Sequence, residues 1–285
     1  MSTTVAGTVS APRHVPPGLA AVAHSARDTL RAEWTKQRTV ATTAWLLAST
    51  AVLTIAVSAL VTAVTRCQAG GFCTADTTKV SLTGVRLAQA GVAVLAVLAI
   101  SDEYATGMIR TTFVAMPRRS GVLAAKAAVL TGLVLASAVV AVAGCLLAGR
   151  LVLPGNGFTP ARGFPVLSLA HGDTLRAAAG SVLYLALAGL LSLGIATAIR
   201  DSAASIGTVL GLLYLAPFLA ALLGAYPAWQ HRVERYAPMS AGLTIQDTTG
   251  LRDLPISPWG GLGVLAVWAT AALLAAGLSL RLRDA

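Results

Sequence analysis

Charged residues are scarce in this chain of 285 residues: Asp, Glu, Lys and Arg make up 11% of the sequence, whereas 56% of it is hydrophobic. The core of a soluble protein of this length cannot enclose so much apolar surface. The composition therefore excludes an ordinary water-soluble protein and indicates that lipid covers much of the chain. The net charge of +10 does not indicate a nucleic-acid partner, because the basic residues are spread among the segments that separate the apolar ones.

Recognisable catalytic and nucleotide-binding motifs are missing. No phosphate loop of the form GxxxxGKS or GxxxxGKT occurs, and His14, His24, His171 and His231 stand in no HExxH or Ser-His-Asp arrangement. An enzyme embedded in the membrane would need polar groups that converge at one depth, and the apolar segments offer almost none. We therefore expect no enzymatic activity, no bound cofactor and no metal site in this chain.

Cysteine is rare as well. The three cysteines provide neither the four-ligand spacing of a structural metal site nor a disulfide framework. Cys145 falls inside an apolar segment, while Cys67 and Cys73 share one polar loop. For this pair, one loop disulfide and two free thiols are equally compatible with the sequence.

Six long apolar segments dominate the rest of the chain. The first, residues 40–64, carries no charge and is long enough to cross a hydrocarbon layer of about 30 Å at about 1.5 Å per residue. Five more are compatible with one crossing each: residues 82–100, 127–147, 175–199, 203–225 and 259–280. The sequence thus predicts an all-α membrane protein with six transmembrane helices in one domain, residues 40–280.

Short features refine this prediction in the second half of the chain. Only residues 200–202 separate the fourth and fifth segments, so these two form a tight helical hairpin. Pro217 in the fifth segment removes a backbone hydrogen bond and predicts either a hinge or a static bend. Gly207 and Gly211 have the spacing that lets two helices approach closely, although coincidence explains this spacing equally well.

The two ends of the chain are polar. Residues 1–26 lack apolar periodicity and predict a flexible tail, and residues 281–285 form a second, short tail. Residues 27–38 predict an amphipathic helix at the membrane interface, because Leu30 and Trp34 share one helical face and basic residues are attracted to anionic lipid. The basic residues of this helix include Arg31, Lys36 and Arg38. An ordinary solvated linker helix is the alternative.

The basic residues also predict the orientation in the membrane. Six crossings place both termini on one side, and much of the positive charge falls on that side: Arg27, Arg31, Lys36, Arg38, Arg110, Arg118, Arg119, Lys126, Arg200, Arg281 and Arg283. The positive-inside rule makes this side cytoplasmic. The opposite loops also carry Lys and Arg, so the asymmetry is modest. We expect a multi-pass protein of the cell membrane with cytoplasmic termini.

Residues 101–126 concentrate acids, bases, Gly and Pro directly after an uncharged segment. Placing the charged side chains of Asp102 and Glu103 in lipid would cost roughly several kcal/mol each, as measured in membrane-insertion experiments. We therefore expect them at the inner membrane surface. Gly107 and Pro117 bound a short helical piece between the second and third crossings. Taken alone, this stretch is either a docking segment or a basic loop that merely sets topology.

Several of these residues together resemble the permeases of type-2 ATP-binding-cassette (ABC) transporters. That family has a basic amphipathic helix and a first span, followed by an acidic residue, a Gly, a Pro-basic pair and a Lys. The matching positions here are residues 30–38, Glu103, Gly107, Pro117 with Arg118, and Lys126. Residues 236–246 also look like the external re-entrant segment of the family. The resemblance covers most of the chain except the tail, and it departs at Met108, where a Thr is more usual.

The resemblance implies a function. Residues 103–119 resemble the coupling helix that binds a groove of a separate ATPase subunit, and the residues expected to couple are Asp102, Glu103, Tyr104, Gly107, Arg110, Pro117, Arg118 and Arg119. ATP would be used by that ABC ATPase partner, and a second permease copy, forming a homodimer, would complete the path. An exporter is then expected, embedded in membrane lipid. A non-transporting membrane scaffold or immunity protein is the alternative.

The uncharged crossings bear on the cargo. Their centres lack the ionisable residues that proton- or ion-driven transporters use, which favours a motive force from outside the chain. Apolar and hydroxyl groups would line any path: Thr54, Ser58, Thr62, Ser137, Tyr184, Ser192, Thr197 and Tyr214. Such walls favour a lipophilic or amphiphilic cargo.

Overall fold

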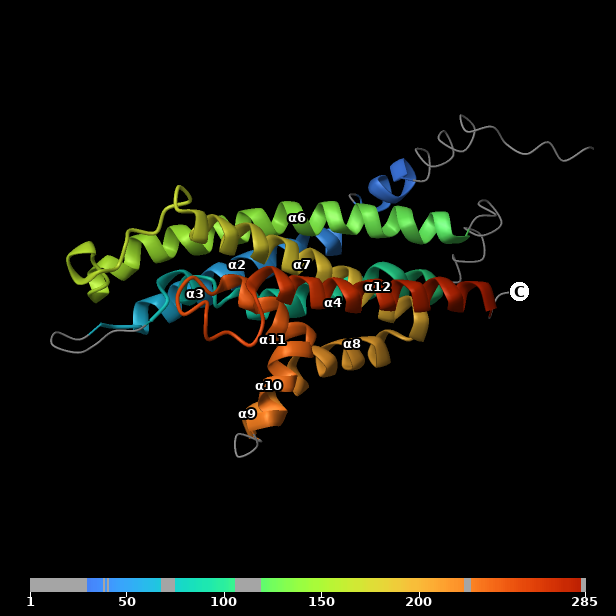
Figure 1. The fold of residues 1–285 in the computed structure, drawn as a ribbon. Coiled ribbons are helices and arrows are strands. Elements are labelled where there is room, and N and C mark those ends of the chain that lie inside the picture. Colours follow the sequence, from blue (N-terminus) through green and yellow to red (C-terminus); the bar gives the residue numbers. More distant parts are fainter. Residues whose placement is uncertain are drawn as a thin grey trace, which may run out of the picture.

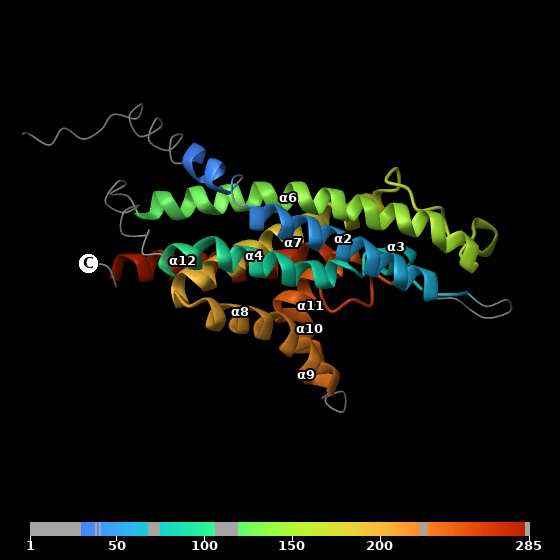
Figure 2. The same cartoon turned by 180° about the vertical axis from the view of Figure 1, so that it is seen from behind.

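The computed structural model of the chain describes residues 30–37, 39, 41–67, 75–105, 119–222 and 227–282. Within these ranges the regular secondary structure is entirely helical, without any strand (Figures 1 and 2). Five helical segments are long and apolar enough to cross a membrane, and they start at Ala41, Gly121, Gly172, Ser202 and Pro258. The prediction of an all-helical fold is thereby confirmed for these residues, and the five apolar helices support a multi-pass membrane protein.

The longest helices lie side by side in one elongated bundle. Helix α7 (Gly172–Ile199) occupies its centre, between α4 (Val85–Ala105), α6 (Arg119–Val152) and α12 (Pro258–Leu282) (Figure 1). Helix α2 (Ala41–Val64) covers α6 and α4 from the outside. Since α6 has 34 residues, it is about 51 Å long and extends beyond a hydrocarbon layer of about 30 Å.

The two ends of the bundle differ in what they contain. Residues 30–37, the end of α4, the start of α6 and the end of α12 lie at one end, which we call the proximal end (Figure 1). The distal end holds α3 (Thr77–Ser81), η1 (Leu153–Asn156), η2 (Pro160–Arg162) and the loop of residues 247–257. The first and last described residues therefore lie at the same end of the bundle. That this end is cytoplasmic stays a prediction.

Helix α4 corresponds to the second predicted crossing, but it starts below the distal surface. Its apolar part, Val85–Ser101, is only about 25 Å long. The backbone N–H of Gly84 donates to Ser58 Oγ at 2.9 Å, and Ser58 lies six residues, or about 9 Å, before the end of α2. A Cβ on Gly84 would lie 2.1 Å from the carbonyl oxygen of Thr54, so only glycine permits this approach. By length and composition, the described residues therefore contain five candidate crossings, and the predicted sixth, α4, stays a prediction.

The turn between α7 and α8 (Ser202–Leu210) is as tight as the sequence predicts. Helix α7 ends at Ile199, and Arg200 adopts a left-handed conformation with φ of 67°. The carboxylate of Asp201 accepts a hydrogen bond from the backbone N–H of Ala204 at 2.7 Å and caps α8. The hairpin thus follows from a left-handed helix end joined directly to an N-cap.

The fifth predicted crossing is not one straight helix. After α8 the chain forms a π-helical turn, η3 (Gly211–Leu215), and then α9 (Ala216–Leu222), which turns away from the bundle (Figures 1 and 2). Pro217 lacks the N–H that would bond the carbonyl of Leu213, so the irregular turn lies directly before the proline. Residues 202–219 are long and apolar enough for one crossing, so the crossing predicted at residues 203–225 contains an irregular turn instead of being one straight helix.

The chain returns to the bundle through three short helices. Helix α10 (Pro227–Tyr236) runs back beside α9, and α11 (Pro238–Leu243) and η4 (Thr244–Gln246) pack against α7 and α12. The Gln246 side-chain amide donates to Ser181 Oγ at 3.0 Å, and both side chains are fully buried. The stretch that resembles a re-entrant segment is therefore helical and anchored inside the bundle.

Candidate functional site

The expected coupling segment joins two helices at the proximal end. Asp102, Glu103 and Tyr104 belong to the last turns of α4, and Arg119 is the first residue of α6. Gly107, Arg110, Pro117 and Arg118 lie outside the described residues. The structure thus locates both attachment points of the segment, while the short helix between them stays a prediction.

The expected interfacial helix is helical over residues 30–37, and Arg38 lies outside the described residues. Leu30 and Trp34 are exposed, although both are large and hydrophobic. Being four residues apart, they share a face that points away from the protein. Arg31 is also exposed and Lys36 is half-buried. This arrangement is the one expected of a helix whose apolar face contacts lipid.

A buried ion pair that the sequence analysis missed attaches this helix to the bundle. Lys126 Nζ lies 3.1 Å from Glu33 Oε2 and also donates to the carbonyl oxygen of Ala99 at 3.3 Å. Glu33 is 7% exposed and Lys126 1%. Lys126 therefore connects residues 30–37, α4 and α6. The sequence does contain a signal for this role, because Lys126 is the one charged residue among the 30 residues that follow Arg119.

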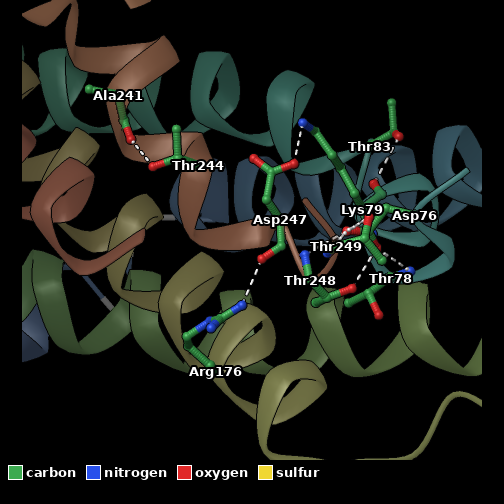
Figure 3. A network of polar contacts seen from close by, with 10 residues as sticks. All are labelled: Asp76, Thr78, Lys79, Thr83, Arg176, Ala241, Thr244, Asp247, Thr248 and Thr249. Carbon is green, nitrogen blue, oxygen red and sulfur yellow. Dashed lines mark hydrogen bonds and ion pairs between the residues drawn. The ribbon is translucent and has the colours of Figure 1, made fainter. Parts of the chain in front are cut away.

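A second polar network closes the distal end (Figure 3). Asp76 Oδ1 caps α3 by accepting the backbone N–H groups of Thr78 and Lys79, each at 3.1 Å. The same carboxylate accepts the Thr248 hydroxyl at 2.7 Å and the Thr249 backbone N–H at 3.1 Å. One carboxylate thus joins the start of α3 to the loop that precedes α12.

The network continues through Asp247 to the start of α7 (Figure 3). Lys79 Nζ lies 2.5 Å from Asp247 Oδ1, and Arg176 donates to the Asp247 backbone oxygen at 2.6 Å. Arg176 also pairs with Asp173 at 3.1 Å. Lys79 and Arg176 thus pair with acidic side chains, while Asp76 accepts hydrogen bonds from both segments. We call this network the distal clasp, because it has the features of a structural contact and not of a catalytic site.

We expect Asp76→Ala to loosen this clasp. The change leaves several backbone and hydroxyl donors without their acceptor, at a cost of about 1–3 kcal/mol, and frees the loop of residues 247–257. Hydrogen exchange of that loop in the purified protein measures the effect. Asp253→Ala, an exposed position in the same loop, is the matched control. Equal exchange in both variants would contradict the assignment.

A third set of polar residues lies deeper, where α4, α7, η3 and α11 meet; we call Arg86, Gln89, Tyr184, Tyr214 and Met239 the central polar cluster. The Tyr184 hydroxyl donates to Gln89 Oε1, and Gln89 Nε2 lies 3.1 Å from the sulfur of Met239. The Tyr214 hydroxyl donates to the backbone oxygen of Arg86. Gln89 and Tyr184 are completely buried, whereas Arg86 is exposed.

This cluster contains a charge that the sequence analysis overlooked. Arg86 and Gln89 fall inside the apolar segment predicted to cross second, near its distal end. Tyr214, a member of the cluster, lies in the π-helical turn η3, and such turns are often found at functional sites. Trp268 Nε1 donates to the Tyr236 backbone oxygen at 3.0 Å and so holds the end of α10 against α12 beside the cluster.

Most of the hydroxyl groups expected to line a path are instead used within the helices. Thr54, Ser192 and Thr197 are fully buried and donate to backbone oxygens four residues earlier, at 2.6, 2.7 and 2.7 Å. Ser58 and Thr62 are fully buried too. Ser137 and Tyr214 are half-buried: Ser137 donates to the backbone oxygen of Leu47 at 3.4 Å, and Tyr214 also belongs to the central polar cluster. The expectation of a wall of hydroxyls is therefore corrected for the buried residues.

The remaining sequence predictions have mixed outcomes. Cys67 is disulfide-bonded and Cys145 is a free, buried thiol, while Cys73, the possible partner named from the sequence, lies outside the described residues. A Cβ on Gly207 or Gly211 would meet no atom within 4 Å, so this spacing makes no close helix contact inside the described chain. The placed residues contain no cluster of His, Cys, Asp or Glu suited to a metal ion.

No protein-family model matches the chain, and no curated protein matches it.

Proposed function

We propose that the chain is the permease subunit of an ATP-driven exporter, as its resemblance to type-2 ABC permeases implies. In this proposal α4 is the sixth crossing, the proximal end faces the cytoplasm, and two copies of the chain form the path. A separate ABC ATPase subunit binds the segment between α4 and α6 and hydrolyses ATP. The chain itself supplies the path and the mechanical coupling, without bond chemistry.

The observation that carries the proposal is the position of Lys126. It lies seven residues after the start of α6 and bonds to Ala99 of α4, so it joins the two helices between which the expected coupling segment runs. Through Glu33 it also holds residues 30–37. A displacement of the segment would therefore move three elements together instead of bending one loop.

This connection suggests how ATP binding would open the path. Closure of two ATPase subunits would pull residues 103–119, and α4 and α6 would follow as a unit because Lys126 holds them together. Helix α7 would respond next, since it packs against both α4 and α6. The proposal is thus alternating access driven from the proximal end.

We expect Glu103→Ala, or reversal of charge at both Arg118 and Arg119, to uncouple ATP hydrolysis from transport. The reason is that these charges would determine how the segment binds the ATPase groove. Transport and ATP hydrolysis are measured together in liposomes that contain the assembled complex. Arg252→Glu, a charge reversal in the exposed distal loop, is the control and should leave both rates unchanged. Wild-type transport by the proximal variants would contradict the coupling role.

A further inference from the structure

The inference starts from Arg86, which is exposed and lacks an acidic partner. No ion pair joins Arg86 to an acidic residue anywhere in the described part of the chain. Its position is nevertheless defined, because the Tyr214 hydroxyl binds its backbone oxygen and keeps it beside the π-helical turn.

The depth of Arg86 makes this lack of a partner unusual. Fifteen residues of α4 separate it from Ser101 near the proximal end, which is about 22 Å. Twelve residues of α8 and η3 separate Ser202 from Tyr214, which is about 18 Å. Both estimates place Arg86 within a hydrocarbon layer of about 30 Å, where an arginine is costly and usually pairs with a charge or lines a pathway.

The acids on neighbouring elements are engaged elsewhere. On α7, Asp173 pairs with Arg176, and beyond η4 Asp247 pairs with Lys79. On α10, Glu234 accepts from Gln230 at 3.0 Å, and Asp201 caps α8. None of these four carboxylates forms an ion pair with Arg86.

Exposed apolar side chains follow both Arg86 and its hydrogen-bond partner Tyr214 along the chain. Leu87 follows it on α4, and Leu215, Phe218 and Leu219 follow Tyr214 on η3 and α9, where the chain turns away from the bundle (Figure 2). A small soluble anion could pair with the single charge but would leave the apolar side chains uncovered. An amphiphile would match the charge and the apolar side chains, because its acid group would pair with the guanidinium and its chain would cover the apolar side chains.

We propose that Arg86 binds the acid group of an anionic amphiphile, one carboxylate, phosphate or sulfate on an apolar chain, which contacts Leu87, Leu215 and Phe218. This ligand is the class of cargo that the exporter would carry, so the inference deepens the proposed function and rests on it. Guanidinium suits the role since its planar donors bind an oxyanion through two parallel hydrogen bonds.

Binding is tested without the ATPase, on the purified full chain in bilayers. The probe is stearic acid with a nitroxide near the end of its chain, compared with its uncharged methyl ester at a pH where the acid is ionised. Electron paramagnetic resonance measures the motionally restricted fraction of each. We expect the wild-type protein to favour the acid roughly tenfold, Arg86→Gln to abolish this preference, and Arg86→Lys to keep part of it.

Two controls distinguish binding at Arg86 from non-specific electrostatic attraction of the acid to the basic protein. Arg66→Gln removes an exposed charge near the distal end of α2 and should leave the preference intact, and inorganic phosphate should not compete with the probe. An unchanged preference in Arg86→Gln, an equal loss in Arg66→Gln, or competition by phosphate would each overturn the proposal. This binding assay contains no ATPase, so its result is independent of the exporter function. If the probe binds through Arg86 but the chain recruits no ATPase, the binding site stands and only the exporter function is refuted.

Discussion

Lys126→Ala is expected to lower the free energy of unfolding by about 3–5 kcal/mol, the range measured when one partner of a buried ion pair is removed. The change leaves the carboxylate of Glu33 buried without its cation and removes the donor that bonds Ala99. We also expect the helix of residues 30–37 to detach from α4 and α6. Thermal unfolding in detergent and protease cleavage near residue 40 measure the two effects.

Two comparison variants make this prediction specific. Replacing both partners, Glu33→Leu with Lys126→Met, should recover most of the lost stability, because no charge then stays buried alone. Arg252→Ala removes an exposed cation of the distal loop, and such surface substitutions usually change stability by about 0.5 kcal/mol or less. If Lys126→Ala unfolds at the same temperature as Arg252→Ala, the pair does not hold the proximal end together.

Gly261→Ala is expected to displace the short helices that pack against α12. A Cβ at this position would lie 1.9 Å from the backbone oxygen of Ala241 and 2.4 Å from the Thr244 hydroxyl, so the backbone of α11 has to move. Forcing an extra methyl into a packed contact costs about 1–3 kcal/mol. The measurement is the unfolding temperature, together with hydrogen exchange of residues 238–246.

The same helix provides the matched control for this substitution. Gly263 is two residues away, and a Cβ there would meet nothing within 4 Å. Gly263→Ala should therefore be neutral or stabilising by about 0.5–1 kcal/mol, as is usual for Gly→Ala within a helix. Equal destabilisation by both variants would contradict the close packing of α11 against α12.

The sequence predicts those parts of the fold that depend on local composition. Long uncharged runs are required wherever a helix faces lipid, so most crossings are visible without a structure. The turn between α7 and α8 was also predictable, because Asp201 is a strong N-cap directly after a long apolar segment. Residues 30–37 were identified as amphipathic from the spacing of Leu30 and Trp34.

The sequence does not reveal contacts between residues far apart in the chain. Glu33 and Lys126 are 93 positions apart and follow no periodic pattern. Helix α4 is covered by α2, α6 and α7, and a covered helix does not need the full apolar length of a lipid-facing one. Arg86 was overlooked because an apolar window tolerates one charge near its end. Pro217 signalled an irregularity, but the direction in which α9 turns depends on tertiary packing.

The central claim, that this chain is the permease of an ATP-driven exporter, is tested most directly by its partners. The tagged chain is purified from its own membrane in mild detergent, and the recovered proteins are identified by mass spectrometry. The account predicts an ATPase that carries a phosphate-binding loop, in near-equal amount to the tagged chain. Reproducible absence of such a subunit would contradict the exporter and favour a membrane scaffold or immunity protein.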